Sequence, residues 1–320
     1  MQYTEGSMVI VVPNKEDSVG LTQISAYSER IPCNKYELKS IIRNEGRPDI
    51  YDKEAFEKQV FKNIIKFVSE ESYKIEIELN YLNLDKLRKY LKNLHYVDDI
   101  NRFHKIVEHG RIDGIKKPCI VYEYLSDNIS NIKLENPSKK FQQSIYFLYD
   151  SLCIINYLHN LGYVHRSIKP STFLVGKSSN SNDYLPLKMT NFETCSKIIT
   201  QEEAKRNPSI VPKSHIQNIK YCSINQHEVG QLYLPCDDIE SWFYMSIGLL
   251  EDGLPWNKLR VEEKNKIIEK KTTLQDKNNL FYCYTPMPIR ELIKSIINKY
   301  EKIDCDEIIF KLYKAIEPNL

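Results

Sequence analysis

Glycine is scarce in this sequence, supplying only 10 of the 320 residues, which is about 3% where an average protein has about 7%. That scarcity argues against a phosphate-binding loop built on several clustered glycines. Cys-x-x-Cys and His-Glu-x-x-His patterns are both missing, which excludes the common zinc sites. The eight cysteines are scattered along the chain, so we predict reduced thiols and a cytoplasmic or nuclear location.

The chain also lacks a large net charge. The chain has 45 basic and 43 acidic side chains, a net charge of +2. Such a balance supplies no long-range attraction to nucleic acid or to an anionic membrane. No apolar run approaches the roughly 18 residues that a membrane span needs. We therefore expect neither a nucleic-acid partner nor a membrane-embedded segment.

The first part of the chain favours strands. Residues 1–34 show no long periodic pattern, and we interpret them as an extension with one strand near residues 9–12. The segment YKIEIEL at 73–79 alternates as a half-buried strand does, and residues 85–94 have the spacing of a short amphipathic helix. The apolar run at 117–125 predicts a further strand. Residues 35–125 are thus expected to form a small β-rich lobe.

The remainder of the chain favours helices. Residues 141–162 have helical spacing and end at a glycine suited to a C-cap. Residues 239–253 are apolar on nearly every face, as in a buried helix, and two more helices are expected at 289–300 and 306–316. The predicted fold class is α+β, with a helical lobe at 126–320, a β-rich lobe before it and a cleft between them.

Four segments carry a family resemblance. YVHRSIKPSTFLVG at 163–176 and LKMTNFETCSK at 187–197 resemble the protein-kinase catalytic loop, H-R-D-x-K-P-x-N, and the D-F-G motif. KYCSINQH at 220–227 and CDDIESWFYMSIGLLEDGLPWNKL at 236–259 resemble the casein kinase 1 superfamily, above all its tau-tubulin kinase and vaccinia-related kinase branches. The resemblance covers about residues 36 to 320 and implies a bilobal protein-kinase fold.

The phosphate-binding parts that the resemblance implies are degenerate. Arg43, Glu45 and Pro48 stand where the family has the glycines of its phosphate turn. Pro48 has no amide hydrogen to donate, and Glu45 places a carboxylate near phosphates of the same sign. Lys74 falls at the third-strand lysine, but no glutamate stands about fourteen residues on, which leaves Asp85 as a candidate substitute.

The catalytic positions are degenerate as well. Ser167 stands in place of the base aspartate, and a hydroxyl does not accept a proton at neutral pH as a carboxylate does. Thr172 and Asn191 replace the two metal ligands, and Glu193 replaces the glycine of D-F-G. The resemblance implies structural roles for the retained residues His165, Arg166 and Asp238, and it leaves Lys169 as a basic residue of the cleft.

These substitutions predict a catalytically inactive member of the superfamily, a pseudokinase that binds other proteins, such as an active kinase or its substrate. No cofactor is expected. Two alternatives stay open: an atypical Ser/Thr kinase using ATP and magnesium with Lys74 and Lys169, and a switch that binds nucleotide without turnover. Basic residues between 197 and 220 further suggest a phosphopeptide or anion site in the activation segment: Lys197, Lys205, Arg206, Lys213, His215 and Lys220.

Overall fold

The structure is a computed structural model of the whole chain. It describes residues 8–13, 30–31, 36–42, 63–90, 101–112, 117–125, 128–129, 137–176, 186–208, 218–228, 230–291 and 305–316. The chain divides into two compact units. Unit 1 comprises residues 1–126 and 190–193, and unit 2 comprises residues 127–189 and 194–320.

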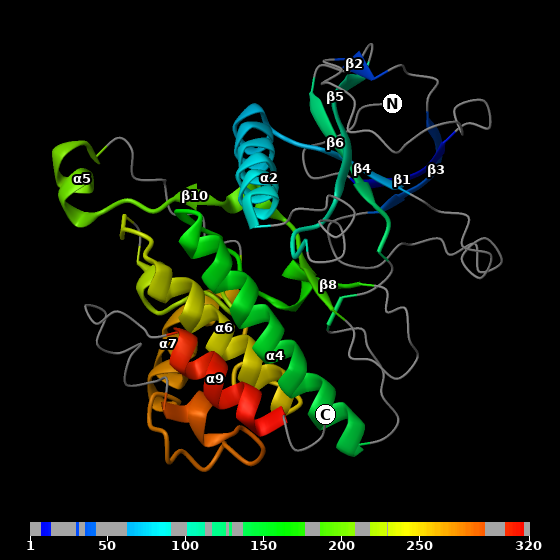
Figure 1. The fold of residues 1–320 in the computed structure, drawn as a ribbon. Helices are drawn as coiled ribbons and strands as arrows, with labels where there is room; N and C mark the ends of the chain where they lie inside the picture. Colours follow the sequence, from blue (N-terminus) through cyan, green and yellow to red (C-terminus); the bar gives the residue numbers. More distant parts are fainter. Residues whose placement is uncertain are drawn as a thin grey trace. The chain divides into compact units, whose positions relative to one another are not determined.

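Unit 1 contains a six-stranded sheet with the order β2-β5-β6-β4-β1-β3 (Figure 1). Neighbouring strands are antiparallel except for the parallel pair β2 and β5. The strands are β1 (Met8–Pro13), β2 (Arg30–Ile31), β3 (Tyr36–Ile42), β4 (Asn63–Phe67), β5 (Ile106–Ile112) and β6 (Pro118–Glu123). The strands expected near 9–12 and at 117–125 are confirmed, and β1 lies inside the sheet, between β4 and β3.

The segment 73–79, expected as a strand, lies within helix α2 (Glu70–Tyr90), so that prediction is wrong. Ser69 caps the helix, since its hydroxyl accepts a hydrogen bond from the Ser72 N–H at 3.1 Å. Buried side chains at 72, 76, 79 and 83 recur at intervals of three and four residues, which is one helical face. Tyr73 and Ile77 pack beside this face on a core that includes Val68. The helix expected from residue 85 is the continuation of α2.

Unit 2 is built on helices. Helix α4 (Pro137–Asn160) packs against α6 (Pro235–Leu250) and α9 (Cys305–Ile316), as Figure 1 shows. Gly162, two residues beyond α4, has a φ of +88°, the left-handed conformation expected of a C-cap glycine. The long helix predicted at 141–162, the central helix at 239–253 and the last helix at 306–316 are thus confirmed. The helix predicted at 289–300 lies largely outside the described residues.

Helix α6 forms the centre of this unit. Trp242 is fully buried, and its indole N–H donates to the Ser151 hydroxyl of α4 at 2.9 Å. The segment containing the Ser-Ile-Asn sequence is tied to the same helix, because the Ser223 hydroxyl donates to Asp237 at 2.6 Å and the Ile224 N–H donates to Glu240 at 2.8 Å. This helix therefore supports both the core and the segment that carries the family resemblance.

The structure confirms the expected mixture of strands and helices, while the bilobal arrangement stays a prediction. Free thiols are found at the six cysteines for which the structure gives a state: Cys119, Cys153, Cys195, Cys222, Cys236 and Cys283. In the described part of the chain, the helices are too short or too polar to cross a membrane.

Candidate functional site

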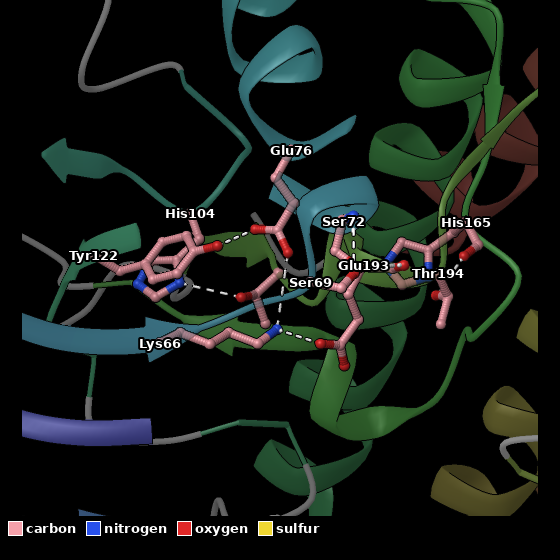
Figure 2. Close-up of polar contacts among 10 residues, drawn as sticks. Lys66, Ser69, Ser72, Glu76, His104, Tyr122, His165, Glu193 and Thr194 are labelled. Carbon is pink, nitrogen blue, oxygen red and sulfur yellow. Dashed lines mark hydrogen bonds and ion pairs between the residues drawn. The ribbon is translucent and has the colours of Figure 1, made fainter. Parts of the chain in front are cut away.

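The charged centre of unit 1 is the ammonium group of Lys66 on β4 (Figure 2). Its side chain is only 4% exposed, and two carboxylates lie near it. Glu193 places Oε2 at 3.1 Å from the Lys66 Nζ, and Glu76 of α2 places Oε1 at 3.8 Å. Lys66 is thus held by one carboxylate from the helix and by a second, closer one from the segment 190–193.

Glu76 is the more deeply placed of the two acids, with a fully buried side chain. Tyr122 of β6 donates its phenolic hydrogen to Glu76 Oε2. Burial raises the pKa of the Glu76 carboxyl, and Lys66 and the Tyr122 hydrogen bond act against that rise. The pKa of Tyr122 is also raised, by burial and by the adjacent Glu76, so its hydroxyl remains a donor. Glu76 is therefore fixed in position by Lys66 and Tyr122.

Lys74 does not belong to this centre. It is exposed on α2, so its expected placement on a strand is wrong, and Asp85 is exposed on the same helix. The lysine that lies on a strand is Lys66, and its acidic partner Glu76 follows ten residues later. Two features of the sequence point to this pair: the short apolar run around Lys66, and the Ser69 cap with its following glutamates at the start of α2.

The segment Thr190 to Glu193 is anchored in unit 1 at several positions. The Thr190 Oγ1 lies 3.1 Å from His104 Nδ1, and the Phe192 ring packs against the Phe103 ring with centroids 4.8 Å apart. His104 Nε2 lies 2.6 Å from the Glu123 carbonyl oxygen. Because that oxygen only accepts, His104 Nε2 carries a hydrogen and donates it. Glu193 is therefore presented to Lys66 by a well-anchored backbone.

The catalytic-like loop lies in unit 2. It begins with β7 (Tyr163–Val164), which pairs with β10 (Ser196–Lys197), and continues through a 3-10 turn (Pro170–Thr172) into β8 (Phe173–Val175), which pairs with β9 (Leu187–Met189). His165 is fully buried, as expected for a structural residue. Its carbonyl oxygen accepts from the Thr194 hydroxyl at 2.8 Å, and Arg166 Nη1 lies 3.5 Å from the Thr194 carbonyl oxygen.

Asp238 of α6 accepts hydrogen bonds from the backbone of this loop, which confirms its expected structural role. Oδ2 accepts from the His165 N–H at 2.7 Å and lies 3.0 Å from His159 Nε2. Oδ1 accepts from the Arg166 N–H at 2.9 Å and from the Tyr233 hydroxyl at 2.8 Å. Burial alone raises the pKa of Asp238, but hydrogen bonds and charges from His159 and His165 outweigh it and hold that pKa below its usual value.

The two substituted positions of the loop interact with each other. Ser167 is 8% exposed, and its carbonyl oxygen accepts from the fully buried Thr172 hydroxyl at 2.7 Å. Lys169 and Asn191 are half-buried, and Asn191 has a φ of +64°, a conformation that asparagine tolerates better than most residues. In the described part of the chain no three His, Cys, Asp or Glu side chains gather as a metal site would require. Arg43, Glu45 and Pro48 lie outside the described residues.

No protein-family model matches the chain. Among curated proteins it resembles the serine/threonine-protein kinase spe-6 of Caenorhabditis elegans, with 27% identity over 52% of this chain and 42% of the relative. A probable serine/threonine-protein kinase of Dictyostelium discoideum is 28% identical over 48% of this chain and 30% of the relative. Casein kinase 1-like protein HD16 of Oryza sativa subsp. japonica is 27% identical over 47% of this chain and 21% of the relative.

This chain is protein-kinase-like. The matches cover less than half the length of each of these relatives, so their activities do not transfer directly. Protein kinases pair a strand lysine with a helix glutamate, which orients the lysine towards the nucleotide phosphates. Lys66 and Glu76 form such a kinase-like pair, and Glu193 is an additional carboxylate on the same lysine.

Proposed function

We propose that this chain is a catalytically inactive protein-kinase-like protein that acts by binding other proteins, such as an active kinase or its substrate. The observation that carries the proposal is the hydrogen bonding of Asp238. Residues 163–176 contain no carboxylate, and both oxygens of Asp238 are already taken by the loop backbone, Tyr233 and His159. This acid is thus committed to holding the loop and does not replace the base missing at Ser167.

The metal-binding positions support the same proposal. Phosphoryl transfer uses divalent cations to neutralise the charge that develops between the phosphates. The Thr172 hydroxyl is buried and donates its hydrogen to the Ser167 carbonyl oxygen. Asn191 offers a neutral amide, which binds a hard divalent cation less well than a carboxylate. These residues do not fit a magnesium site of the kinase kind, and the proposed activity needs neither ATP nor magnesium.

An atypical Ser/Thr kinase is the second candidate, and one observation favours it. The Lys66–Glu76 pair resembles the lysine–glutamate pair with which protein kinases orient a lysine towards the nucleotide phosphates. The Lys66–Glu76 pair also supports the third candidate, a switch that binds nucleotide without turnover. Both require ATP to reach Lys66, where Glu193 already lies at 3.1 Å.

A nucleotide titration with a transfer assay separates the three candidates. We expect no thermal shift of the wild-type protein with ATP, with or without magnesium or manganese, and no transfer of labelled phosphate to itself or to a peptide library. Lys66→Met is the matched variant, and it should behave as the wild type does. Phosphate transfer by the wild type that Lys66→Met abolishes would establish the atypical kinase, and a Lys66-dependent shift without transfer would establish the switch.

The partner surface and the location are proposed on sequence grounds. Helix α5 (Gln201–Arg206) exposes Lys205 and Arg206 to solvent. The Lys220 Nζ lies 5.2 Å from the centroid of the adjacent Tyr221 ring. Lys213 and His215 lie outside the described residues. A phosphopeptide or other anion at this segment remains a proposal, as does a cytoplasmic or nuclear location. Unchanged phosphopeptide binding by a Lys213→Ala, Lys220→Ala double variant would contradict the anion site.

A further inference from the structure

The carboxylate of Glu193 lies 3.1 Å from Lys66, a strand lysine that is paired with a helix glutamate as the phosphate-binding lysine of protein kinases is. We propose that Glu193 is an autoinhibitory residue: its carboxylate occupies the phosphate-binding side of Lys66, and removing that carboxylate opens a site for a triphosphate-class anion. This inference rests on the proposed function, because it explains why a chain that retains the Lys66–Glu76 pair would not take up nucleotide.

Charge is the first argument for the inhibition. Lys66 supplies one positive charge to two carboxylates, so the group carries a net negative charge when both acids are ionised. The lysine is 4% exposed, and water screens such a buried pair weakly. An incoming phosphate would therefore compete with Glu193 for Lys66 and would be repelled by it at close range. Both effects weaken anion binding, and both disappear when Glu193 loses its charge.

Exposure distinguishes the two acids. The Glu76 side chain is fully buried and receives a hydrogen bond from Tyr122, whereas the Glu193 side chain is 30% exposed. Figure 2 shows the two carboxylates approaching Lys66 from α2 and from the segment after β9. Glu76 is the fixed partner that orients the lysine, and Glu193 is the partner that a soluble anion could replace.

The main chain around Glu193 is anchored by contacts of its own, apart from the ion pair with Lys66. Ser72, in the first turn of α2, directs its hydroxyl to the Glu193 carbonyl oxygen at 3.4 Å, and the Ser72 hydroxyl accepts from the Ser69 hydroxyl at 2.8 Å. Thr190 and Phe192 are anchored by His104 and Phe103. The main chain of Glu193 is therefore held independently of its side chain, so a substitution of the side chain should leave the segment in place.

Anion binding to side-chain variants tests the proposal. Glu193→Gln removes the charge at nearly constant size, and Glu193→Ala removes the side chain. Glu71→Gln, an exposed position on α2, changes the net charge equally and serves as the control. We expect calorimetric titration with inorganic tripolyphosphate, and separately with ATP, to show binding at least about tenfold tighter in both Glu193 variants than in the wild type or in Glu71→Gln. Adding Lys66→Met to Glu193→Ala should abolish the gain.

The proposal is overturned if both Glu193 variants keep the wild-type circular dichroism and urea midpoint yet bind tripolyphosphate no more tightly. It is equally overturned if the gain in binding survives Lys66→Met. The proposed lack of catalysis fails by a different result, the transfer of phosphate by the wild-type protein. Tighter anion binding by the Glu193 variants without phosphate transfer supports both statements together.

Discussion

His227 illustrates how a single residue is held in one protonation state. It is fully buried, and its Nε2 lies 3.0 Å from the Lys271 Nζ. Lys271 also donates to the carbonyl oxygens of Ile219 at 3.0 Å and Cys222 at 2.5 Å, and its Nζ lies 3.8 Å from Cys222 Sγ, so each of the three ammonium hydrogens has an acceptor within reach. The rings of Tyr244 and Trp256 lie 4.9 and 5.6 Å from the same nitrogen. His227 must therefore accept as a neutral imidazole.

The pH dependence of stability follows from this arrangement. Burial, Lys271 and Lys264 lower the pKa of His227 to about 3, from an ordinary value of 6.5. Between pH 6.5 and 3, His227 is protonated in the unfolded chain but stays neutral in the folded chain. The free energy of unfolding therefore decreases as the pH falls towards 3. The wild type should lose up to about 1.4 kcal/mol per pH unit from this source, and His227→Gln should lose less. Urea midpoints at pH 7, 6, 5 and 4 measure the two slopes, and equal slopes would contradict the assignment.

Individual elements show why the helical unit was the easier half to predict. Helices α4 and α6 have long apolar patterns of their own, and their boundaries fall within a few residues of those expected. Helix α2 was harder, because Tyr73, Ile75, Ile77 and Leu79 alternate and so fit a strand equally well. The buried face of α2 carries the polar residues Ser72, Glu76 and Asn83, so apolar periodicity does not reveal it. Its Ser69 cap was the better indicator.

A buried hydrogen bond links α4 to α6. The Trp242 indole donates to the Ser151 hydroxyl at 2.9 Å, and both residues are fully buried. Ser151→Ala should destabilise the protein by about 1–3 kcal/mol, because the indole N–H is left without its acceptor. In a Trp242→Phe background the same change should cost less, since there is no indole N–H to satisfy. Urea unfolding of the four proteins checks this, and equal costs in both backgrounds would argue against the bond.

At the scale of the whole molecule, two buried acids hold parts of the structure in place. Asp238 holds the catalytic-like loop, and Glu76 holds Lys66. The base position is a serine, and the Lys66 ammonium is shared with Glu193. Phosphoryl transfer needs these parts together, so repairing one of them should not create activity.

Ser167→Asp puts a carboxylate back at the base position and tests that statement. We expect no transfer of labelled phosphate by this variant, because Thr172, Asn191 and Glu193 are unchanged. Ser171→Asp, in the same loop, adds an equal charge away from the base position and serves as the control. Transfer by Ser167→Asp but not by the wild type or by Ser171→Asp would contradict this expectation, because a single carboxylate would then be enough and the other substitutions would be tolerated.

The sequence by itself determined the mixed α+β class, the long helices and the chemical identity of the loop residues. These properties are local: apolar periodicity sets a helix, and a serine lacks a carboxylate wherever it lies. The scarcity of glycine is also a property of the sequence alone. The phosphate turn in which glycines are replaced, at Arg43, Glu45 and Pro48, lies outside the described residues. The free thiols, too, were predicted from spacing and are found at the cysteines whose state the structure gives.

Only the tertiary structure decided which charges meet. Lys66 and Glu76 come from a strand and a helix that local patterns indicate, but nothing in the local sequence brings Glu193, which lies far along the chain, to them. The sequence placed the lysine at Lys74 and left it without an acid, whereas the fold supplies two acids to Lys66. The physical reason is that ion pairs across a sheet and a helix depend on how both elements pack, and packing brings together residues that no short sequence pattern relates.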